Sequence, residues 1–173
     1  MIKPGVIIGA RYEIIDRIGS GGMAVVYKAF DNIDHRIVAV KILKNEFSAN
    51  EEFVRRFRNE SKAIAVLSHP NIVKVLEWFE ANNTYYYAME YCEAGSLDSL
   101  IQQGCGLSQK ESLEYIMQLG DALQYMHDNK MLHLDMKPSN VMLRKKGEAV
   151  LIDFGLSKQY TEDGGPESST TIG

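Results

Sequence analysis

The residues best suited to chemistry lie near the C-terminal end of the sequence. Asp135 and Asp153 each end a mostly apolar run, which places both carboxylates at the mouth of an element, and Lys137 and Asn140 follow the first of them closely. One such aspartate is commonly a helix or turn cap. Two of them beside a lysine and a carboxamide are hard to explain by capping alone. Groups of these types can together hold a hydroxyl, a magnesium ion and a phosphate.

A second pair of charges interrupts an apolar pattern earlier in the chain. Residues 37–43 are apolar on both faces of a predicted strand except at Lys41, and Glu60 fills the gap in an apolar helical stripe. A single inward charge can be a snorkelling side chain. Two opposite charges on successive elements favour an ion pair, and a partly buried ion pair is better evidence of a site than of stability. The stripe consists of Phe53, Phe57, Ile64 and Leu67.

Residues 19–27 form a glycine-rich loop between two predicted strands. Glycine there lets backbone N–H groups approach phosphate oxygens without an intervening Cβ. Taken alone, such a pattern more often marks a plain hairpin turn than a phosphate-binding loop. It is not a dinucleotide-binding fingerprint, because a strand follows it and not a helix.

Strands in the first half and helices in the second must position these groups. β-Branched and aromatic runs predict strands at 12–18, 25–30, 36–43, 73–80 and 84–91. Helices are predicted at about 49–67, 96–103 and 108–129, with Ser48 or Asn50 capping the first, and a hairpin at about 144–148 leads into 149–152. The β-rich part gives way to the helical part near 90–95. The last helix has apolar residues near helical period at Leu113, Ile116, Met117, Leu119, Leu123 and Met126.

Composition narrows the class of protein. A chain of 173 residues with 45% hydrophobic content fits a globular domain, and a net charge of −4 argues against nucleic acid or anionic membrane as a partner. Its two cysteines, Cys92 and Cys105, give neither a disulfide framework nor a zinc set and suggest a reducing compartment. No membrane span or signal peptide is visible. We therefore expect a cytoplasmic chain, or the cytoplasmic part of a longer protein.

The residues 133–140, the run Asp153-Phe154-Gly155, the glycine loop and Lys41 in 38–41 together resemble the signature of Ser/Thr-type protein kinases. Residues 8–14 resemble the openings of bacterial members. The resemblance implies an α+β, protein-kinase-like two-lobed fold. Residues 1–90 would form a complete N-lobe, an antiparallel sheet with one long helix, and 91–173 a partial helical C-lobe. Because the family's later elements have no match here, the chain is expected to be truncated within its activation segment.

The resemblance also assigns catalytic roles. Lys41 matches the lysine that contacts the α- and β-phosphates, and Glu60 matches the glutamate that orients it. Asp135 would accept or orient the proton of the substrate hydroxyl, and Lys137 would steady the γ-phosphate, as in Ser/Thr kinases. The Mg²⁺ ligands would be Asn140 and Asp153. His133 is interpreted as a packing residue and not as a base.

An ATP pocket follows from the same resemblance. Backbone groups at 90–92 would bind the adenine edge, Met89 would gate the pocket behind it, and Val26 and Ala39 would lie on the adenine. The complete set of nucleotide-binding residues is Ile18, Gly19, Ser20, Gly21, Gly22, Val26, Ala39, Lys41, Met89, Glu90, Cys92 and Met142.

Two residues depart from the family's pattern. Ala24 stands in place of the third glycine of the loop, and Leu134 stands where the family commonly has an arginine before the catalytic aspartate. That arginine normally pairs with a phosphorylated residue of the activation segment. With Leu134 in its place, the cation needed to switch activity through such a pair is missing at this position. The Ser/Thr-rich stretch 162–171 still offers Thr170 and Thr171 as candidate phosphosites.

The implied function is transfer of the γ-phosphoryl group of ATP, with Mg²⁺, to Ser or Thr hydroxyls of a protein substrate. The alternative is a nucleotide-binding or protein-interaction module that transfers no phosphate. The intact motif residues favour the enzyme for the parent protein, whereas the missing C-terminal elements favour the module for this chain. Without those elements the helix at 108–129 lacks a packing partner, which favours self-association.

Overall fold

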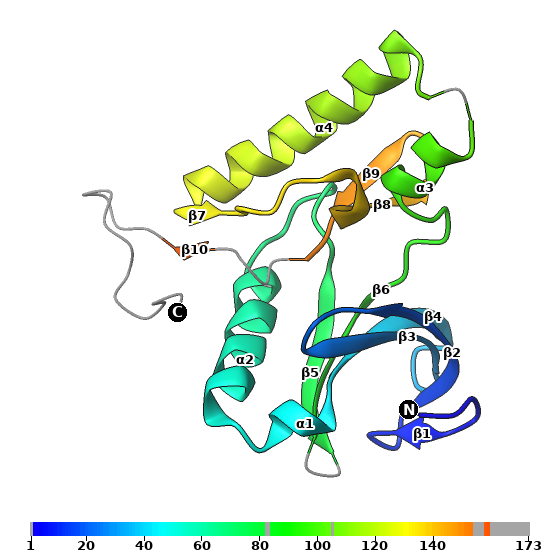
Figure 1. The fold of residues 1–173 in the computed structure, drawn as a ribbon, viewed down its shortest axis with the longest axis vertical. Helices are drawn as coiled ribbons and strands as arrows, with labels where there is room; N and C mark the ends of the chain where they lie inside the picture. The colour runs from blue at the N-terminus through cyan, green and yellow to red at the C-terminus, as the bar shows by residue number, and fades with distance from the viewer. Residues whose placement is uncertain (1, 82–83, 105, 154–157, 160–173) are drawn as a thin grey trace. The chain divides into compact units, whose positions relative to one another are not determined.

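A computed structural model describes residues 2–81, 84–104, 106–153 and 158–159 of the chain (Figure 1). The chain divides into two compact units. The first comprises Met1–Val66 and Lys74–Tyr91, and the second comprises Leu67–Val73 and Cys92–Gly173. The assignment of residues 1–90 and 91–173 to two kinase lobes stays a prediction.

The first unit is built on a six-stranded sheet in which all neighbouring strands are antiparallel, in the order β1-β2-β3-β4-β6-β5. All five predicted strands are present, and the predicted strand 36–43 matches β4 to the residue. The short β1 was not predicted. The strands are β1 (Ile7–Ile8), β2 (Tyr12–Ser20), β3 (Ala24–Asp31), β4 (Arg36–Leu43), β5 (Val75–Ala81) and β6 (Thr84–Glu90).

The two faces of this sheet carry different sets of side chains. Paired residues on adjacent strands point to the same side, and successive residues alternate. Val26 pairs with Lys41, and Lys41 pairs with Tyr87, so these three share one face. The same face packs through Leu43 and Tyr87 against Phe57 of the following helix. The opposite face holds an apolar core that includes Tyr12, Ile14, Tyr27, Ala29, Val38, Val40, Ile42, Tyr86 and Ala88.

Helix α2 (Glu51–Ala65) follows a short helix, α1 (Asn45–Ser48), which was not predicted. The side chain of Asn50 accepts a hydrogen bond from the N–H of Glu52, so Asn50 is the N-cap of the two residues proposed. This N-cap sets the start of α2 at Glu51, and the helix ends at Ala65, so it is shorter than the predicted 49–67. Its buried residues are Phe57, Glu60, Ser61 and Ile64, which confirms that one carboxylate faces inward.

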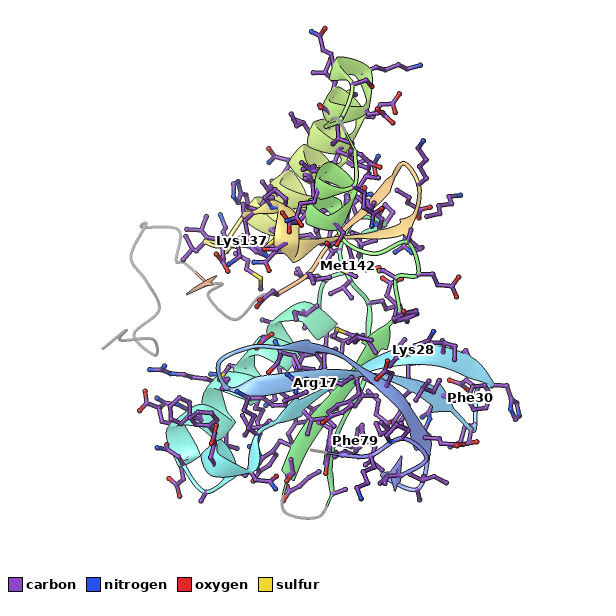
Figure 2. The ribbon with its side chains drawn as sticks, turned by 45° about the vertical axis from the view of Figure 1, so that its right-hand side comes forward. Arg17, Lys28, Phe30, Phe79, Lys137 and Met142 are labelled. Atoms are coloured by element: carbon purple, nitrogen blue, oxygen red, sulfur yellow. The ribbon has the colours of Figure 1, made fainter. Side chains whose placement is uncertain are left out.

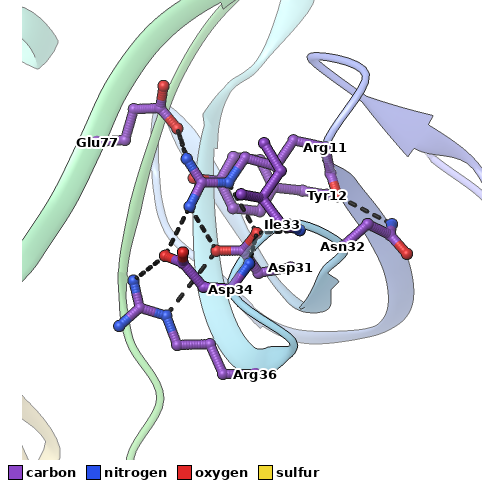
Figure 3. Close-up of polar contacts among 8 residues, drawn as sticks. All are labelled: Arg11, Tyr12, Asp31, Asn32, Ile33, Asp34, Arg36 and Glu77. Atoms are coloured by element: carbon purple, nitrogen blue, oxygen red, sulfur yellow. Dashed lines mark hydrogen bonds and ion pairs between the residues drawn. The ribbon is translucent and has the colours of Figure 1, made fainter.

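A charged cluster joins the start of β2 to the β3–β4 turn and to β5 (Figure 3). Arg11 donates two hydrogen bonds of 2.7 Å to Asp31, and it also reaches Asp34 at 2.8 Å and Glu77 at 3.0 Å. Tyr12 donates its hydroxyl to Glu77 at 2.6 Å. Asp31 is fully buried, and its bonds with Arg11 lower its pKa to about 2 although burial alone would raise it. The cluster therefore fixes distant parts of the chain to each other.

The second unit combines helices with two small antiparallel sheets. Both predicted helices and the predicted hairpin are present, while strands β7 and β10 were not predicted. Helix α4 begins in a capping box, in which Ser108 and Glu111 satisfy each other's backbone N–H groups. No helix among the described residues is both long and apolar enough to cross a membrane. The elements are α3 (Leu97–Gln102), α4 (Gln109–Asp128), β7 (Met131–Leu132), a 3₁₀ helix (Pro138–Asn140), β8 (Val141–Lys145), β9 (Glu148–Leu151) and β10 (Lys158–Gln159).

Helix α4 carries an apolar stripe that the described residues only partly cover. Its buried side chains are Tyr115, Ala122 and Met126, and only the last belongs to the predicted set. Three other apolar positions of the stripe are exposed: Leu113 by 53%, Ile116 by 63% and Met117 by 70%. This agrees with the expectation that the helix would lack a packing partner for its apolar face.

Candidate functional site

Lys41 and Glu60 form an ion pair inside the first unit. The Nζ atom of Lys41 lies 2.5 Å from Oε1 of Glu60, and their side chains are exposed by only 15% and 2%. Tyr87 donates its hydroxyl to the same oxygen at 2.9 Å, and its ring centroid lies 5.7 Å from Nζ of Lys41. Glu60 Oε2 is buried with no hydrogen-bond partner among the described residues. The predicted pair is therefore present, and a phenol helps to fix it.

The glycine loop joins β2 to β3, and its first glycine lies in register with strand residues that share a face with Lys41. Gly19 pairs with Val26, which in turn pairs with Lys41, and the N–H of Gly21 donates to the carbonyl of Ala24 at 2.9 Å. An added Cβ would meet nothing within 4 Å at Gly22. At Gly21 it would meet only one carbonyl oxygen, at 3.8 Å. Packing among the described residues does not require glycine at these positions, so an approaching ligand is the better reason for it.

The predicted adenine-binding residues share the face that carries Lys41. Ala39 pairs with Met89 across β4 and β6, and both stand on the same side as Val26 and Lys41. Ala39 is buried, whereas Val26 and Met89 are half-buried. Ile18, at a register shift in β2, is 44% exposed. One strip of the sheet thus presents small or apolar side chains beside the ammonium group of Lys41.

The predicted hinge residues lie where the chain passes from one unit to the other. Glu90 is tied to Lys74 twice: its N–H donates to the Lys74 carbonyl at 3.0 Å, and its carboxylate accepts from the Lys74 N–H at 2.9 Å. The N–H of Glu90 is therefore already bonded to the backbone just before β5, so it is not the hinge donor. Cys92 is buried in the second unit. Met142, labelled in Figure 2, is half-buried on β8 and pairs with Val150.

In the second unit, Asn140 connects to Asp135 by two hydrogen bonds. Its Nδ2 donates to the backbone carbonyl and to Oδ2 of Asp135, each at 2.9 Å. Lys137, also labelled in Figure 2, places its Nζ 3.4 Å from the same Oδ2. Asn140 is buried and ends the 3₁₀ helix, whereas Lys137 is exposed. Three of the predicted catalytic and metal-binding residues therefore meet within one short loop.

His133 joins this loop to the segment before Asp153. The backbone N–H of Asp135 donates to His133 Nδ1 at 3.2 Å, so Nε2 carries the ring proton and donates to the carbonyl of Ile152 at 3.0 Å. The N–H of Ile152 donates to the carbonyl of Asn140, also at 3.0 Å. His133 is 2% exposed. The interpretation of His133 as a packing residue is confirmed, and the same bonds hold Asp153 near Asn140.

Two residues of this region adopt left-handed backbone conformations. Leu134 has φ of 64° and Asp153 has φ of 58°, values that non-glycine residues adopt uncommonly and that cost energy. Both side chains are exposed. Strain of this kind clusters at functional sites. Phe154, Gly155, Thr170 and Thr171 lie outside the described residues.

Comparison with known proteins decides the family. The protein kinase domain matches residues 12–172. The chain belongs to the protein kinase family. The α+β, protein-kinase-like fold expected from the motifs is confirmed.

Curated relatives of this kinase chain include three bacterial proteins. A probable serine/threonine-protein kinase of Clostridium perfringens is 41% identical over 154 residues, covering 89% of this chain and 22% of that protein. PrkC of Bacillus subtilis, a serine/threonine-protein kinase, is 39% identical over 165 residues, covering 95% and 24%. PknA of Mycobacterium tuberculosis, also a serine/threonine-protein kinase, is 37% identical over 173 residues, which cover 97% of this chain and 40% of that protein. The chain thus spans between 22% and 40% of the length of these relatives.

The predicted site residues of the kinase fall into two sets, one in each unit. The glycine loop, Lys41, Glu60 and Met89 belong to the first, and the residues from Cys92 to Asp153 belong to the second. Sequence reasoning missed Tyr87 as a partner of Glu60, because three tyrosines in a row give no sign of which one faces the helix. It also missed Lys44, whose Nζ donates to the Gly22 carbonyl at 2.7 Å.

Proposed function

We propose that this kinase chain carries the nucleotide-binding and catalytic residues of a serine/threonine-protein kinase. The whole protein would transfer the γ-phosphoryl group of ATP to Ser or Thr hydroxyls of a protein substrate. The observation that carries the proposal is the ion pair of Lys41 and Glu60, a cation held rigidly on a face that it shares with strand residues in register with the first glycine of the loop. The relatives named as serine/threonine-protein kinases support the choice of acceptor.

Lys41 would neutralise phosphate charge next to the glycine loop. A lysine has a flexible stem, so it stabilises a fixed charge well only when its ammonium group is already positioned. Glu60 supplies that position, and Tyr87 holds the carboxylate. Since both charges are largely removed from water, their interaction with phosphate is screened less than on an open surface.

Asp135 would receive the proton of the attacking hydroxyl. As the hydroxyl oxygen bonds to the γ-phosphorus, the bond between that phosphorus and the ADP oxygen breaks, and the hydroxyl proton passes to the carboxylate. Asn140 and Lys137 engage Oδ2, and no hydrogen bond from the described residues reaches Oδ1. The Oδ1 atom is therefore the better placed acceptor. Lys137 would steady the γ-phosphoryl group during its transfer.

The residues present fit a magnesium ion. Asn140 uses its amide nitrogen on Asp135, which turns its Oδ1 away from that carboxylate, and Asp153 offers an exposed carboxylate. Few protein oxygens, completed by water and phosphate, are what Mg²⁺ prefers. Bound there, the ion would neutralise charge on the β- and γ-phosphates. We also propose the cytoplasm as the location, because the reaction needs ATP.

Transfer of ³²P from labelled ATP to a basic protein, measured beside ATP binding, tests the proposal in the intact protein. Asp135→Asn keeps the shape of the side chain but removes the proton acceptor. It should bind Mg-ATP as the wild type does and lose about 10²- to 10⁴-fold in transfer rate. Phosphoamino acid analysis should find phosphoserine or phosphothreonine. Binding without transfer by the wild type would show a nucleotide-binding module instead.

Removal of the second metal ligand provides an independent test. Asp153→Ala should lower affinity for ATP when Mg²⁺ is present and leave affinity for adenosine unchanged, because only the phosphates contact the ion. Unchanged Mg²⁺-dependent affinity would contradict the metal assignment while leaving the role of Lys41 untouched.

A further inference from the structure

Lys44 contacts the glycine loop at two consecutive carbonyl groups. Its backbone N–H donates to the carbonyl of Met23 at 2.9 Å, and its Nζ donates to the carbonyl of Gly22 at 2.7 Å. Lys44 is half-buried and follows directly after β4. The first bond continues the pairing of β3 with β4, whereas the second depends on the side chain.

Lys44 lies beside residues of the sheet face opposite to Lys41. Together with Val25, Tyr27 and Ile42 it lines a cavity of about 260 Å³. Tyr27 and Ile42 belong to the apolar core on the face of the sheet that turns away from Lys41. Lys44 thus contacts the loop from beside residues that face away from Lys41.

The contact of Lys44 has a consequence for the next amide group. In a planar trans peptide the C=O and the following N–H point in opposite directions, and the described residues contain no cis bond. A Gly22 carbonyl fixed toward Lys44 therefore aims the N–H of Met23 away from Lys44. A Cβ added at Gly22 would meet no described atom within 4 Å, so without this bond the Gly22–Met23 peptide group could rotate readily.

The geometry points to Lys44 as a positioning residue for phosphate binding. It orients the Gly22–Met23 peptide so that a backbone N–H faces the phosphate tail of the nucleotide, and it does not touch the nucleotide itself. This role rests on the proposed ATP binding. It predicts an effect confined to ligands that carry phosphates, because the loop tip does not contribute to the adenine-binding strip formed by Val26, Ala39 and Met89.

Calorimetric titration of the intact protein with Mg-ATP and with adenosine tests this role. Lys44→Met keeps the length of the stem and removes the donor. It should weaken Mg-ATP binding about three- to tenfold, roughly the net worth of one ordinary hydrogen bond, because Lys44 acts on the phosphates only through the Gly22–Met23 peptide group. It should leave adenosine binding unchanged. Lys44→Arg retains charged N–H donors and should restore most of the Mg-ATP affinity. Lys3→Met, at an exposed lysine of the same unit, is the matched control and should bind as the wild type does.

Each outcome of the titration has a distinct meaning. If the wild type binds adenosine but gains nothing from the phosphates of ATP, the proposed function fails. If the wild type binds Mg-ATP tightly and Lys44→Met binds it equally well, the proposed function stands and the role of Lys44 is refuted. Equal weakening of ATP and adenosine binding, with a lower melting temperature, would also refute it, because Lys44 would then only support the fold.

Discussion

The amide nitrogen of Asn140 lies 2.9 Å from both the backbone carbonyl and the Oδ2 atom of Asp135. One side chain thus fixes both the path of the loop and the direction of the carboxylate. Asn140→Ala should remove both bonds and the predicted oxygen ligand. We expect kcat to fall at least about tenfold, since misplacement of a catalytic group is costly even at about 1 Å. Steady-state kinetics over a range of Mg²⁺ concentrations will measure it, and a kcat equal to that of the wild type would contradict the assignment.

Lys41 and Glu60 should separate activity from stability. Lys41→Met leaves a buried carboxylate without its cation, which should reduce the free energy of unfolding by about 2–4 kcal/mol and abolish transfer. Replacing both residues, Lys41→Met with Glu60→Leu, removes the unpaired charge as well. The double variant should recover much of the lost stability in urea denaturation and none of the activity. Recovery of transfer by the double variant would show that the pair has no role in catalysis.

The Arg11–Asp31 contact should make stability sensitive to acid. The pKa of Asp31 in the folded chain is about 2, below its ordinary value of 3.8. Its contribution is therefore complete above about pH 4 and is lost as the pH falls toward 2. Asp31→Asn should be less stable at neutral pH and should lose less stability over that acid range than the wild type. Urea denaturation at several pH values measures both slopes, and parallel slopes would contradict the shift.

The exposed apolar residues of α4 should promote association of the isolated 173-residue chain. Leu113, Ile116 and Met117 form an apolar patch on one helix, and patches of this kind favour contacts between molecules. Light scattering should give a mass above that of one chain at high concentration. Ile116→Glu with Met117→Glu should lower it, whereas Gln124→Glu, at an exposed position of the same helix, should not. A single-chain mass for the wild type at high concentration would rule the association out.

Sequence patterns were sufficient where the information is local. The β-branched run of β4 and the cap at Asn50 identified their elements, and the inward charges of Lys41 and Glu60 were visible as breaks in apolar patterns. Asp135 and Asn140 were also recognised as members of one site, because they lie only five positions apart in the sequence.

Contacts that depend on strand register could not be predicted. Arg11 meets a residue 66 positions away, and that meeting depends on how β2 and β5 are placed across the sheet. Tyr87 differs from its neighbour Tyr86 only in the face that it occupies, which a one-residue slip would reverse.

Folding and ligand binding place different demands on Gly22, because no described atom lies within 4 Å of a Cβ added there. A heat-denaturation survey of variants would therefore pass an alanine at this position as harmless. If the loop binds the triphosphate as proposed, only an assay that includes the triphosphate would detect the damage. For this loop, tolerance measured by melting is therefore no guide to tolerance in the living cell.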